Sequence, residues 1–216
     1  MVKVPHKTLE RKLFGQGYEH IIGVDEVGMG CLAGPVVVCA LSVAPVFYEK
    51  WHPALARMRD SKLLQAHQRQ HYADQLEQIP GLAWQIALCD PNVIDEMNIY
   101  QASRPAMREA IQKLEIKNQN GIVLIDGNKN IPELALPQRA IVGGDRKIWA
   151  IAAASILAKV HRDSLMMQYA GQYPGYGFEI HKGYSTALHR AQLAVLGPCP
   201  LHRRSFRGVD LTGLTE

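Results

Sequence analysis

The chain has 216 residues, of which 24 are Lys or Arg, 20 are Asp or Glu and only four are Cys. This length allows one domain with a substantial hydrophobic core. A composition that is 47% hydrophobic and 20% charged excludes disordered, collagen-like and low-complexity proteins. The cysteines show no Cys-x-x-Cys spacing, and the charged N-terminus has no hydrophobic signal segment. We therefore expect a soluble cytoplasmic protein with reduced thiols and no membrane association.

The net charge of +4 is unevenly distributed along the chain. Residues 1–138 carry 14 basic and 15 acidic side chains, a net charge of −1, whereas residues 139–216 carry 10 basic and five acidic ones, a net charge of +5. A basic C-terminal third fits either a solvated helix surface or a surface that meets phosphates. The charge pattern alone leaves both interpretations open.

The apolar pattern of the first half predicts strands and helices in alternation. We expect a short helix at 7–16, strands at 21–27 and 35–43, a helix at 63–78 that Asp60 or Ser61 caps, and a strand at 83–89. The Gly-rich connection between the first two strands suggests that they pair. Residues 91–114 have helical periodicity, although Pro105 must interrupt this helix or begin its second half.

The second half contains two further predicted strands, at 121–126 and 139–142, and two helices, at 147–169 and near 185–195. The first of these helices has small residues on one side, which allow close packing against a sheet. Strands mixed with helices indicate an α/β or α+β sheet covered by helices. Without an internal repeat or a long linker, we expect residues 1–216 to form one domain.

Carboxylates lie at or beside the ends of three predicted strands. Asp25 and Glu26 end the first strand, Asp126 precedes Gly127, and Asp145 follows a pair of glycines. Buried carboxylates are costly, and several at one sheet edge repel each other unless cations bind between them. An all-oxygen ligand set suits Mg²⁺ or Mn²⁺, and two such ions can bind an attacking water and a leaving oxygen in phosphoryl transfer.

Each acid also has a purely structural interpretation. Asp-Gly pairs are common in turns, and for Asp126 alone this is the better explanation. Acidic residues are rare inside strands, so Asp25 and Glu26 are harder to explain in this way. Because neighbouring strand residues point to opposite faces, these two acids can share a site only at a strand end or an irregularity.

Several motifs resemble the ribonuclease HII family, the type 2 ribonucleases H. They are GVDEVGMGCLAGPVV from residue 23, DSK from 60, IDG from 125, GD from 144, IAAASILAKVHRD from 151, HKGY from 181 and PLHRRSF from 200. The matches run in order from about residue 20 to residue 206. This resemblance implies an α/β, ribonuclease H-like fold: a central mixed five-stranded sheet flanked by helices, with a small C-terminal helical extension. It also implies that this single domain has a catalytic core at about 20–170 and that the extension, at about 171–216, binds substrate.

The resemblance also implies an activity. It is endonucleolytic cleavage of the RNA strand of RNA·DNA hybrids and of duplex DNA on the 5′ side of embedded ribonucleotides, leaving 3′-hydroxyl and 5′-phosphate ends. Asp25, Glu26, Asp126 and Asp145 match the family's four catalytic, metal-binding carboxylates, with two Mn²⁺ or Mg²⁺ ions as cofactors. We interpret Asp163 as a structural or substrate-side acid rather than a ligand. No protein partner is indicated, residues 210–216 show no partner-binding motif, and we expect a monomer.

Substrate contacts are carried over from the same family. Its ribonucleotide sensor is a Gly-Arg-Gly loop with a tyrosine, which here match Gly28, Met29, Gly30 and Tyr184. Contact with the 2′-hydroxyl is what distinguishes RNA from DNA. The candidate phosphate contacts are Lys62, Arg146, His181, Lys182, Arg203 and Arg204, of which the last two could instead anchor the C-terminal segment.

The sequence departs from the family pattern at two places. Met29 replaces the loop arginine and removes a charge-assisted hydrogen bond of about 1.5 to 3 kcal/mol. Gly143 replaces a lysine, part of whose charge Arg146 can supply. We predict retained metal chemistry with weakened or altered substrate affinity. The alternatives are a resolvase or transposase-like nuclease, against which the Tyr184 segment argues, and a non-catalytic hybrid-binding protein, against which the four retained acids argue.

Overall fold

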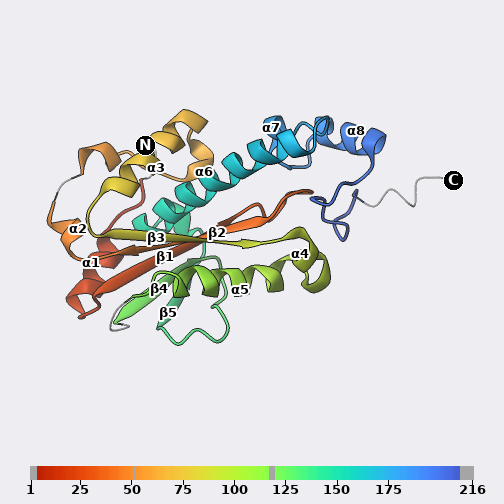
Figure 1. Cartoon of the computed structure of the whole chain (residues 1–216). Coiled ribbons are helices and arrows are strands. Elements are labelled where there is room, and N and C mark those ends of the chain that lie inside the picture. Colours follow the sequence, from red (N-terminus) through yellow and green to blue (C-terminus); the bar gives the residue numbers. More distant parts are fainter. Residues whose placement is uncertain (1–3, 51, 117–119, 210–216) are drawn as a thin grey trace.

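The computed structural model describes residues 4–50, 52–116 and 120–209, which form a five-stranded mixed sheet with helices on both faces (Figure 1). The strands are β1 (His20–Val27), β2 (Val36–Val43), β3 (Leu82–Cys89), β4 (Gly121–Asp126) and β5 (Gln138–Ile141), in the order β3-β2-β1-β4-β5. β1 and β2 are antiparallel, as are β2 and β3, whereas β1, β4 and β5 are parallel. The carboxyl ends of three strands therefore meet at one edge, where α/β sheets bind their ligands.

The helices cover both faces of this sheet. They are α1 (Thr8–Gly15), α2 (Val46–Glu49), α3 (Ala66–Gln78), α4 (Pro91–Met97), α5 (Ile99–Gln112), α6 (Trp149–Gln172), α7 (Phe178–His181) and α8 (Ala187–Leu196), with 3₁₀ turns η1 (Pro53–Leu55), η2 (Ser61–Leu63) and η3 (Gly144–Arg146). α1, α3 and α6 lie on one face and α4 and α5 on the other, while α7 and α8 lie near the far end of α6 (Figure 1). Within the described ranges, every helix is too short or too polar to cross a bilayer.

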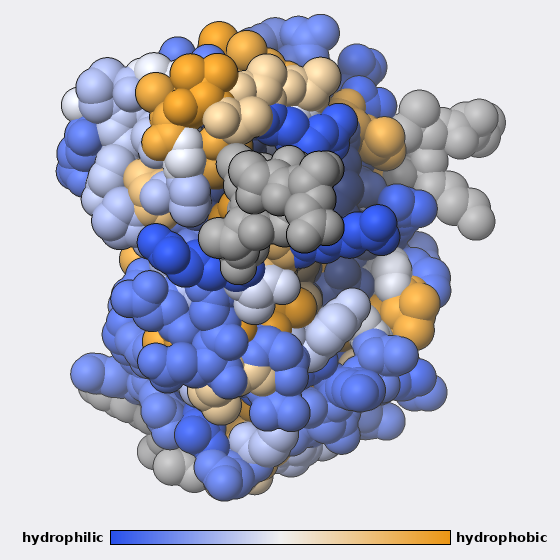
Figure 2. Space-filling model, turned by 90° about the vertical axis from the view of Figure 1, so that its right-hand side faces the viewer, coloured by the Kyte–Doolittle hydropathy of each residue, from blue (hydrophilic) through white to orange (hydrophobic). Residues whose placement is uncertain are grey.

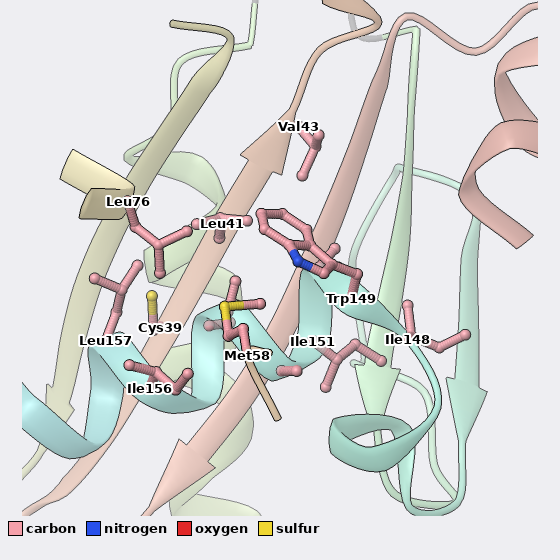
Figure 3. Close-up of a cluster of buried hydrophobic side chains, with 14 of the residues drawn as sticks. Cys39, Leu41, Val43, Met58, Leu76, Ile148, Trp149, Ile151, Ile156 and Leu157 are labelled. Carbon is pink, nitrogen blue, oxygen red and sulfur yellow. The ribbon is translucent and has the colours of Figure 1, made fainter. Parts of the chain in front are cut away.

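The alternation of side chains along β1 divides the interior into two cores. Ile21 packs in the core beneath α6, and Ile22 packs in the core above α5. Figure 3 shows the first of these cores, where the ring of Trp149 of α6 lies beside Leu41 of β2 and Ile151 of α6 lies beside Ile148. Burial of these apolar side chains on both faces is what holds β1 in the centre of the sheet.

β1 and α6 approach each other almost backbone to backbone. A Cβ atom added to Gly23 would lie 2.3 Å from the carbonyl carbon of Ala150, so only glycine fits there. The small residues of α6 thus allow the close packing that the sequence predicts. Glu10 of α1 supports the same helix end, because its carboxylate accepts a hydrogen bond from the Ala150 N–H at 3.2 Å. Nothing local in the sequence indicates this last contact.

The predicted helix at 91–114 is wrong in one respect, since it is two helices that break at Asn98. The backbone of Asn98 lies in the left-handed region, with φ of 71°, and its side chain accepts hydrogen bonds from the N–H groups of Tyr100 and Gln101 at 3.1 Å. This conformation is costly for a residue other than glycine, and the two hydrogen bonds that Asn98 accepts as the N-cap help to offset the cost. Pro105, expected at the break, lies inside α5 on an exposed position.

The start of the predicted helix at 63–78 also differs. Asp60 caps the short turn η2 rather than α3, because its carboxylate accepts the N–H of Lys62 at 2.9 Å. α3 begins at Ala66, where the side chains of Gln65 and Gln68 form a reciprocal capping box. This leaves Lys62 on a turn that projects toward the end of the sheet.

Three histidines form a buried cluster in the C-terminal extension. The rings of His181 and His189 stack with their centroids 4.1 Å apart, and the Nε2 atoms of His189 and His202 lie 3.1 Å apart. Burial lowers the pKa of His189 and of His202 to about 4. The residues after 209, where we expect no partner-binding motif, lie outside the described part of the chain.

This cluster predicts a loss of stability in mild acid. In the unfolded chain His189 and His202 titrate near pH 6.5. Between pH 6.5 and 4 the unfolded state therefore binds more protons, and unfolding becomes easier as the pH falls. We expect the thermal unfolding midpoint to drop by about 5 °C or more from pH 7 to pH 4.5, measured by circular dichroism. A His202→Gln variant should show a flatter profile. An equally steep profile in that variant would contradict the assignment.

Candidate active site

Four carboxylates gather at the edge formed by the ends of the parallel strands. Asp25 and Glu26 lie at the end of β1, Asp126 is the last residue of β4, and Asp145 lies in η3, directly after β5. Asp25 and Asp145 are buried, and the Glu26 N–H donates a hydrogen bond to Asp25 Oδ1 at 2.8 Å. The structure thus brings the four sequence-predicted acids to one end of the sheet from three separate segments.

These carboxylates sit in an unfavourable electrostatic environment. Burial, followed by repulsion from Glu26 and Asp126, raises the pKa of Asp25 well above its ordinary value. Burial and the charge of Asp126 raise the pKa of Glu26 to about 7. Among the described residues, the buried Oε2 atom of Glu26 has no hydrogen-bond partner. A bound cation would relieve both the repulsion and the unpaired oxygen.

The donor atoms fit a hard divalent cation, although the side chains are not yet arranged around one point. Asp126 Oδ1 accepts the Gly144 N–H at 2.7 Å, and Asp145 Oδ2 lies 3.5 Å from Lys62 Nζ. Across residues 4–50, 52–116 and 120–209, no three His, Cys, Asp or Glu side chains are already positioned to hold one ion. The set is nevertheless all-oxygen, as Mg²⁺ and Mn²⁺ require. Side-chain rotation would be needed to bring the carboxylates together.

The Asp-Ser-Lys motif in η2 places the ammonium group of Lys62 beside the acids. Lys62 reaches Asp145, while Asp60 accepts a hydrogen bond from Arg146 Nε at 3.1 Å. The turn is fixed to α6 because the hydroxyl oxygens of Ser61 and Ser155 lie 2.9 Å apart. The side chain of Lys62 is 70% exposed and so remains accessible to a phosphate.

The glycine loop after β1 is tightly packed at Gly28 and exposed to solvent at Gly30. Gly28 has φ of 98°, and a Cβ there would lie 2.4 Å from Arg162 Nε, so a larger residue is excluded. Gly30 is exposed, and a Cβ added there would have no atom of the described chain within 4 Å. The Met29 side chain packs against the core on the α5 face.

Arg162 of α6 is the functional residue that sequence reasoning missed. Its guanidinium is fully buried and donates hydrogen bonds to the carbonyls of Pro35 at 3.0 Å, Ala33 at 2.9 Å and Lys182 at 2.8 Å. It therefore ties the segment after the glycine loop to the segment that carries Tyr184. The only signal was its place inside the long helix motif, which says nothing about where the side chain points.

Arg203 makes a second buried connection. It donates to the Gly34 carbonyl at 3.0 and 2.8 Å and to the Met29 carbonyl at 3.1 Å. Of the two roles considered for this residue, anchoring the C-terminal segment is therefore confirmed. Arg204 is exposed, and its backbone N–H donates to Asp95.

Tyr184 lies beside the glycine loop, since it forms an isolated antiparallel bridge with Cys31. The residue is 37% exposed, and its ring rests against Lys159 and Arg162, whose charged groups lie 5.1 and 5.7 Å from the ring centroid. Burial raises the pKa of Tyr184 to about 12, which keeps its hydroxyl protonated. Lys159 also pairs with Asp163 at 2.7 Å, which fits a structural role for that acid.

The phosphate contact expected at His181 is wrong. The ring is buried, with Nε2 2.7 Å from the Tyr176 carbonyl and Nδ1 accepting the Gly183 N–H at 3.1 Å. Both nitrogens are therefore occupied inside the extension. The Lys182 ammonium donates to the Glu179 carbonyl and so folds back on α7.

Solved structures show the class to which this fold belongs. The ribonuclease H2 of Pyrococcus horikoshii OT3 matches with a TM-score of 0.73 and 25% identity, covering 88% of this chain and 95% of its own. Bst-RNase HIII in complex with Mn²⁺ shares the fold at 19% identity, with a TM-score of 0.66, covering 91% of this chain and 70% of its own. The chain thus has the ribonuclease H-like fold, as predicted.

Sequence comparison identifies the family. The family model for ribonuclease HII matches residues 22–209. A ribonuclease HII of Chlorobium chlorochromatii (strain CaD3) is 45% identical over 202 residues, which are 94% of this chain and 96% of the relative. The chain therefore belongs to the ribonuclease HII family. It is a ribonuclease H, a hydrolase of RNA·DNA hybrids that needs a divalent metal ion.

Proposed function

We propose that the protein also nicks duplex DNA on the 5′ side of embedded ribonucleotides, leaving 3′-hydroxyl and 5′-phosphate ends, with two Mn²⁺ or Mg²⁺ ions. The observation that carries this proposal is the position of Tyr184 and of the Gly28–Gly30 loop next to four carboxylates at one sheet edge. A single 2′-hydroxyl can then be recognised beside the bond to be cut. Because the loop and the tyrosine contact one nucleotide, a single ribonucleotide is enough for recognition and cleavage of the strand that contains it.

The chain's own groups have distinct tasks in this proposal. Asp25, Glu26, Asp126 and Asp145 hold the divalent ions, which lower the pKa of a water and stabilise the departing oxygen when bound. Lys62, beside Asp145, is placed to contact a substrate phosphate. No protein nucleophile is needed.

Selection of the ribonucleotide falls to the loop and the tyrosine. The open backbone at Gly30 offers donors and acceptors that a Cβ would shield, and the exposed face of Tyr184 can stack on the sugar. Because Arg162 contacts both segments, their spacing is fixed before the substrate arrives. A rigid pair of this kind favours discrimination between RNA and DNA.

The decisive experiment compares three duplexes of one sequence: all DNA, DNA with a single internal ribonucleotide, and an RNA·DNA hybrid. Each is incubated with Mg²⁺, Mn²⁺ or a chelator, and the products are separated on a sequencing gel. We expect one metal-dependent nick 5′ of the ribonucleotide and none in the all-DNA duplex. Cleavage of the hybrid alone would refute the nicking activity. Nicking of all-DNA duplex would refute the role of the 2′-hydroxyl.

We further infer that the protein acts as a monomer in the cytoplasm. The four acids, the loop and Tyr184 all come from one chain, so the candidate site is complete without a second copy. Light scattering of the active sample should give a mass near 24.0 kDa.

A further inference from the structure

We propose that Arg104 of α5, together with Lys129, binds a phosphate of the nucleic-acid substrate next to the scissile one, and so supplies the cation that the Gly-Met-Gly loop lacks. This inference rests on the proposed function. It assigns a substrate-positioning role to two residues outside the sheet edge and outside the recognised motifs.

The first observation is a cavity of about 340 Å³ that Arg104 shares with the acids. Its walls include Glu26, Met29, Tyr100, Arg104, Asp126 and Lys129. Two carboxylates of the candidate active site and two cations therefore face one space. The uncharged side chain of Met29 lines the same cavity.

The second observation is that this cavity continues along the surface. A neighbouring cavity of about 520 Å³ is lined by the same Tyr100, Arg104 and Lys129, and also by Arg108. Tyr100 is 70% exposed where the two cavities meet. Cations beside an exposed aromatic ring are the usual means of following a nucleic-acid backbone. Figure 2 shows strongly hydrophilic residues gathered along the hollowed band between the upper and lower parts of one face.

The third observation concerns the partners of these cations. Arg108 pairs with Glu133, but among the described residues neither Arg104 nor Lys129 forms an ion pair with a carboxylate. Arg104 Nη1 donates to the Lys129 carbonyl at 3.3 Å and contacts the Met107 sulfur at 3.5 Å. These contacts hold the guanidinium at the cavity, while Nε and Nη2 keep donors for a ligand.

Arg104 also shares the cavity with Glu26, so its charge can act on the site without contacting a phosphate. A purely electrostatic role of this kind would alter kcat and its pH profile. A phosphate contact would instead alter KM, the dissociation constant and the salt dependence of binding. The two roles are therefore separable by measurement.

The experiment uses the full chain and the duplex with one ribonucleotide. We expect Arg104→Ala to raise KM about ten-fold or more, with kcat within about two-fold of wild type, since a charge-assisted hydrogen bond is lost. The slope of log affinity against log salt concentration should become less steep by about 0.9, the value for one phosphate contact. Lys113→Ala, at the other end of α5 and paired with Glu109, is the matched control and should leave both values unchanged.

A second variant tests the position of the phosphate. Met29→Arg should restore a wild-type KM in the Arg104→Ala background, because the new arginine then supplies the missing cation. In the wild-type background Met29→Arg should lower KM by a smaller factor, because Arg104 already contacts the phosphate. Failure to restore KM would place the phosphate elsewhere. If an active Arg104→Ala enzyme has an unchanged KM and salt slope, the role of Arg104 is overturned, while the proposed nicking function still stands. If the wild-type enzyme leaves the ribonucleotide duplex intact, the proposed nicking function itself is overturned.

Discussion

Asp126→Asn should lower the rate of cleavage by at least about 1000-fold while the fold persists. Asparagine keeps the oxygen that accepts the Gly144 N–H at 2.7 Å, so the connection between β4 and η3 survives. It loses the negative charge that an ion requires, and losing about 4 kcal/mol of transition-state stabilisation corresponds to this factor. The measurement is a single-turnover rate with saturating enzyme and Mg²⁺ or Mn²⁺.

Two comparisons complete that experiment. Asp74→Asn, on the exposed side of α3, removes an equal charge far from the sheet edge and should retain wild-type activity. In chelator, the Asp126→Asn protein should unfold at the wild-type temperature or above it, since Asp126 raises the pKa of Asp25 and Glu26 by repulsion. An Asp126→Asn enzyme within ten-fold of wild type would remove Asp126 from the ligand set.

Arg162→Met should lower the thermal unfolding midpoint by about 10 °C and weaken substrate binding. The variant leaves the carbonyls of Ala33, Pro35 and Lys182 without their donor. Unsatisfied buried groups cost about 1 to 3 kcal/mol each, and in a chain of this size each kcal/mol corresponds to about 2 to 4 °C. Because these carbonyls flank the glycine loop and Tyr184, we expect KM for the ribonucleotide duplex to rise as well.

The conservative variant Arg162→Lys keeps the charge and part of the hydrogen bonding, so it remains measurable where the methionine variant does not fold. It should fall between wild type and Arg162→Met in both stability and KM. Arg11→Met, on the exposed surface of α1, controls for the loss of a surface guanidinium. Wild-type stability in Arg162→Met would show that water replaces the buried donor at no cost.

The sheet was predictable because its strands are apolar runs that glycine or acids terminate. β1, β2 and β4 lie within one residue of their predicted bounds. The acids lie at the carboxyl ends of the parallel strands β1 and β4 and in η3, after β5. The family motifs then indicated the fold that the comparisons confirm. What the local pattern could not reveal is the break at Asn98, where one residue with positive φ outweighs continuous helical periodicity.

The basic C-terminal third was harder to interpret. Its positive charge suggested a surface for phosphates, yet Arg162 and Arg203 are fully buried. Their acceptors are carbonyls from residues 29–35 and 182, and no sequence periodicity records contacts between such distant segments. Conversely, Arg104 and Lys129 lie in the first 138 residues, whose net charge is negative. Charge summed along a chain therefore does not locate charge on the folded surface.

The backbone contact between Gly23 and Ala150 joins residues far apart in the sequence, so it limits how much of the protein can fold while the chain is still being synthesised. β1 leaves the ribosome early, but its acids have no partners until β4, η3 and α6 have followed, and the loop after β1 is fixed only when residues 162 and 203 arrive. Contacts this distant in sequence cannot form during synthesis until both segments have been made. A partly synthesised chain that ends before η3 therefore lacks the assembled acidic site.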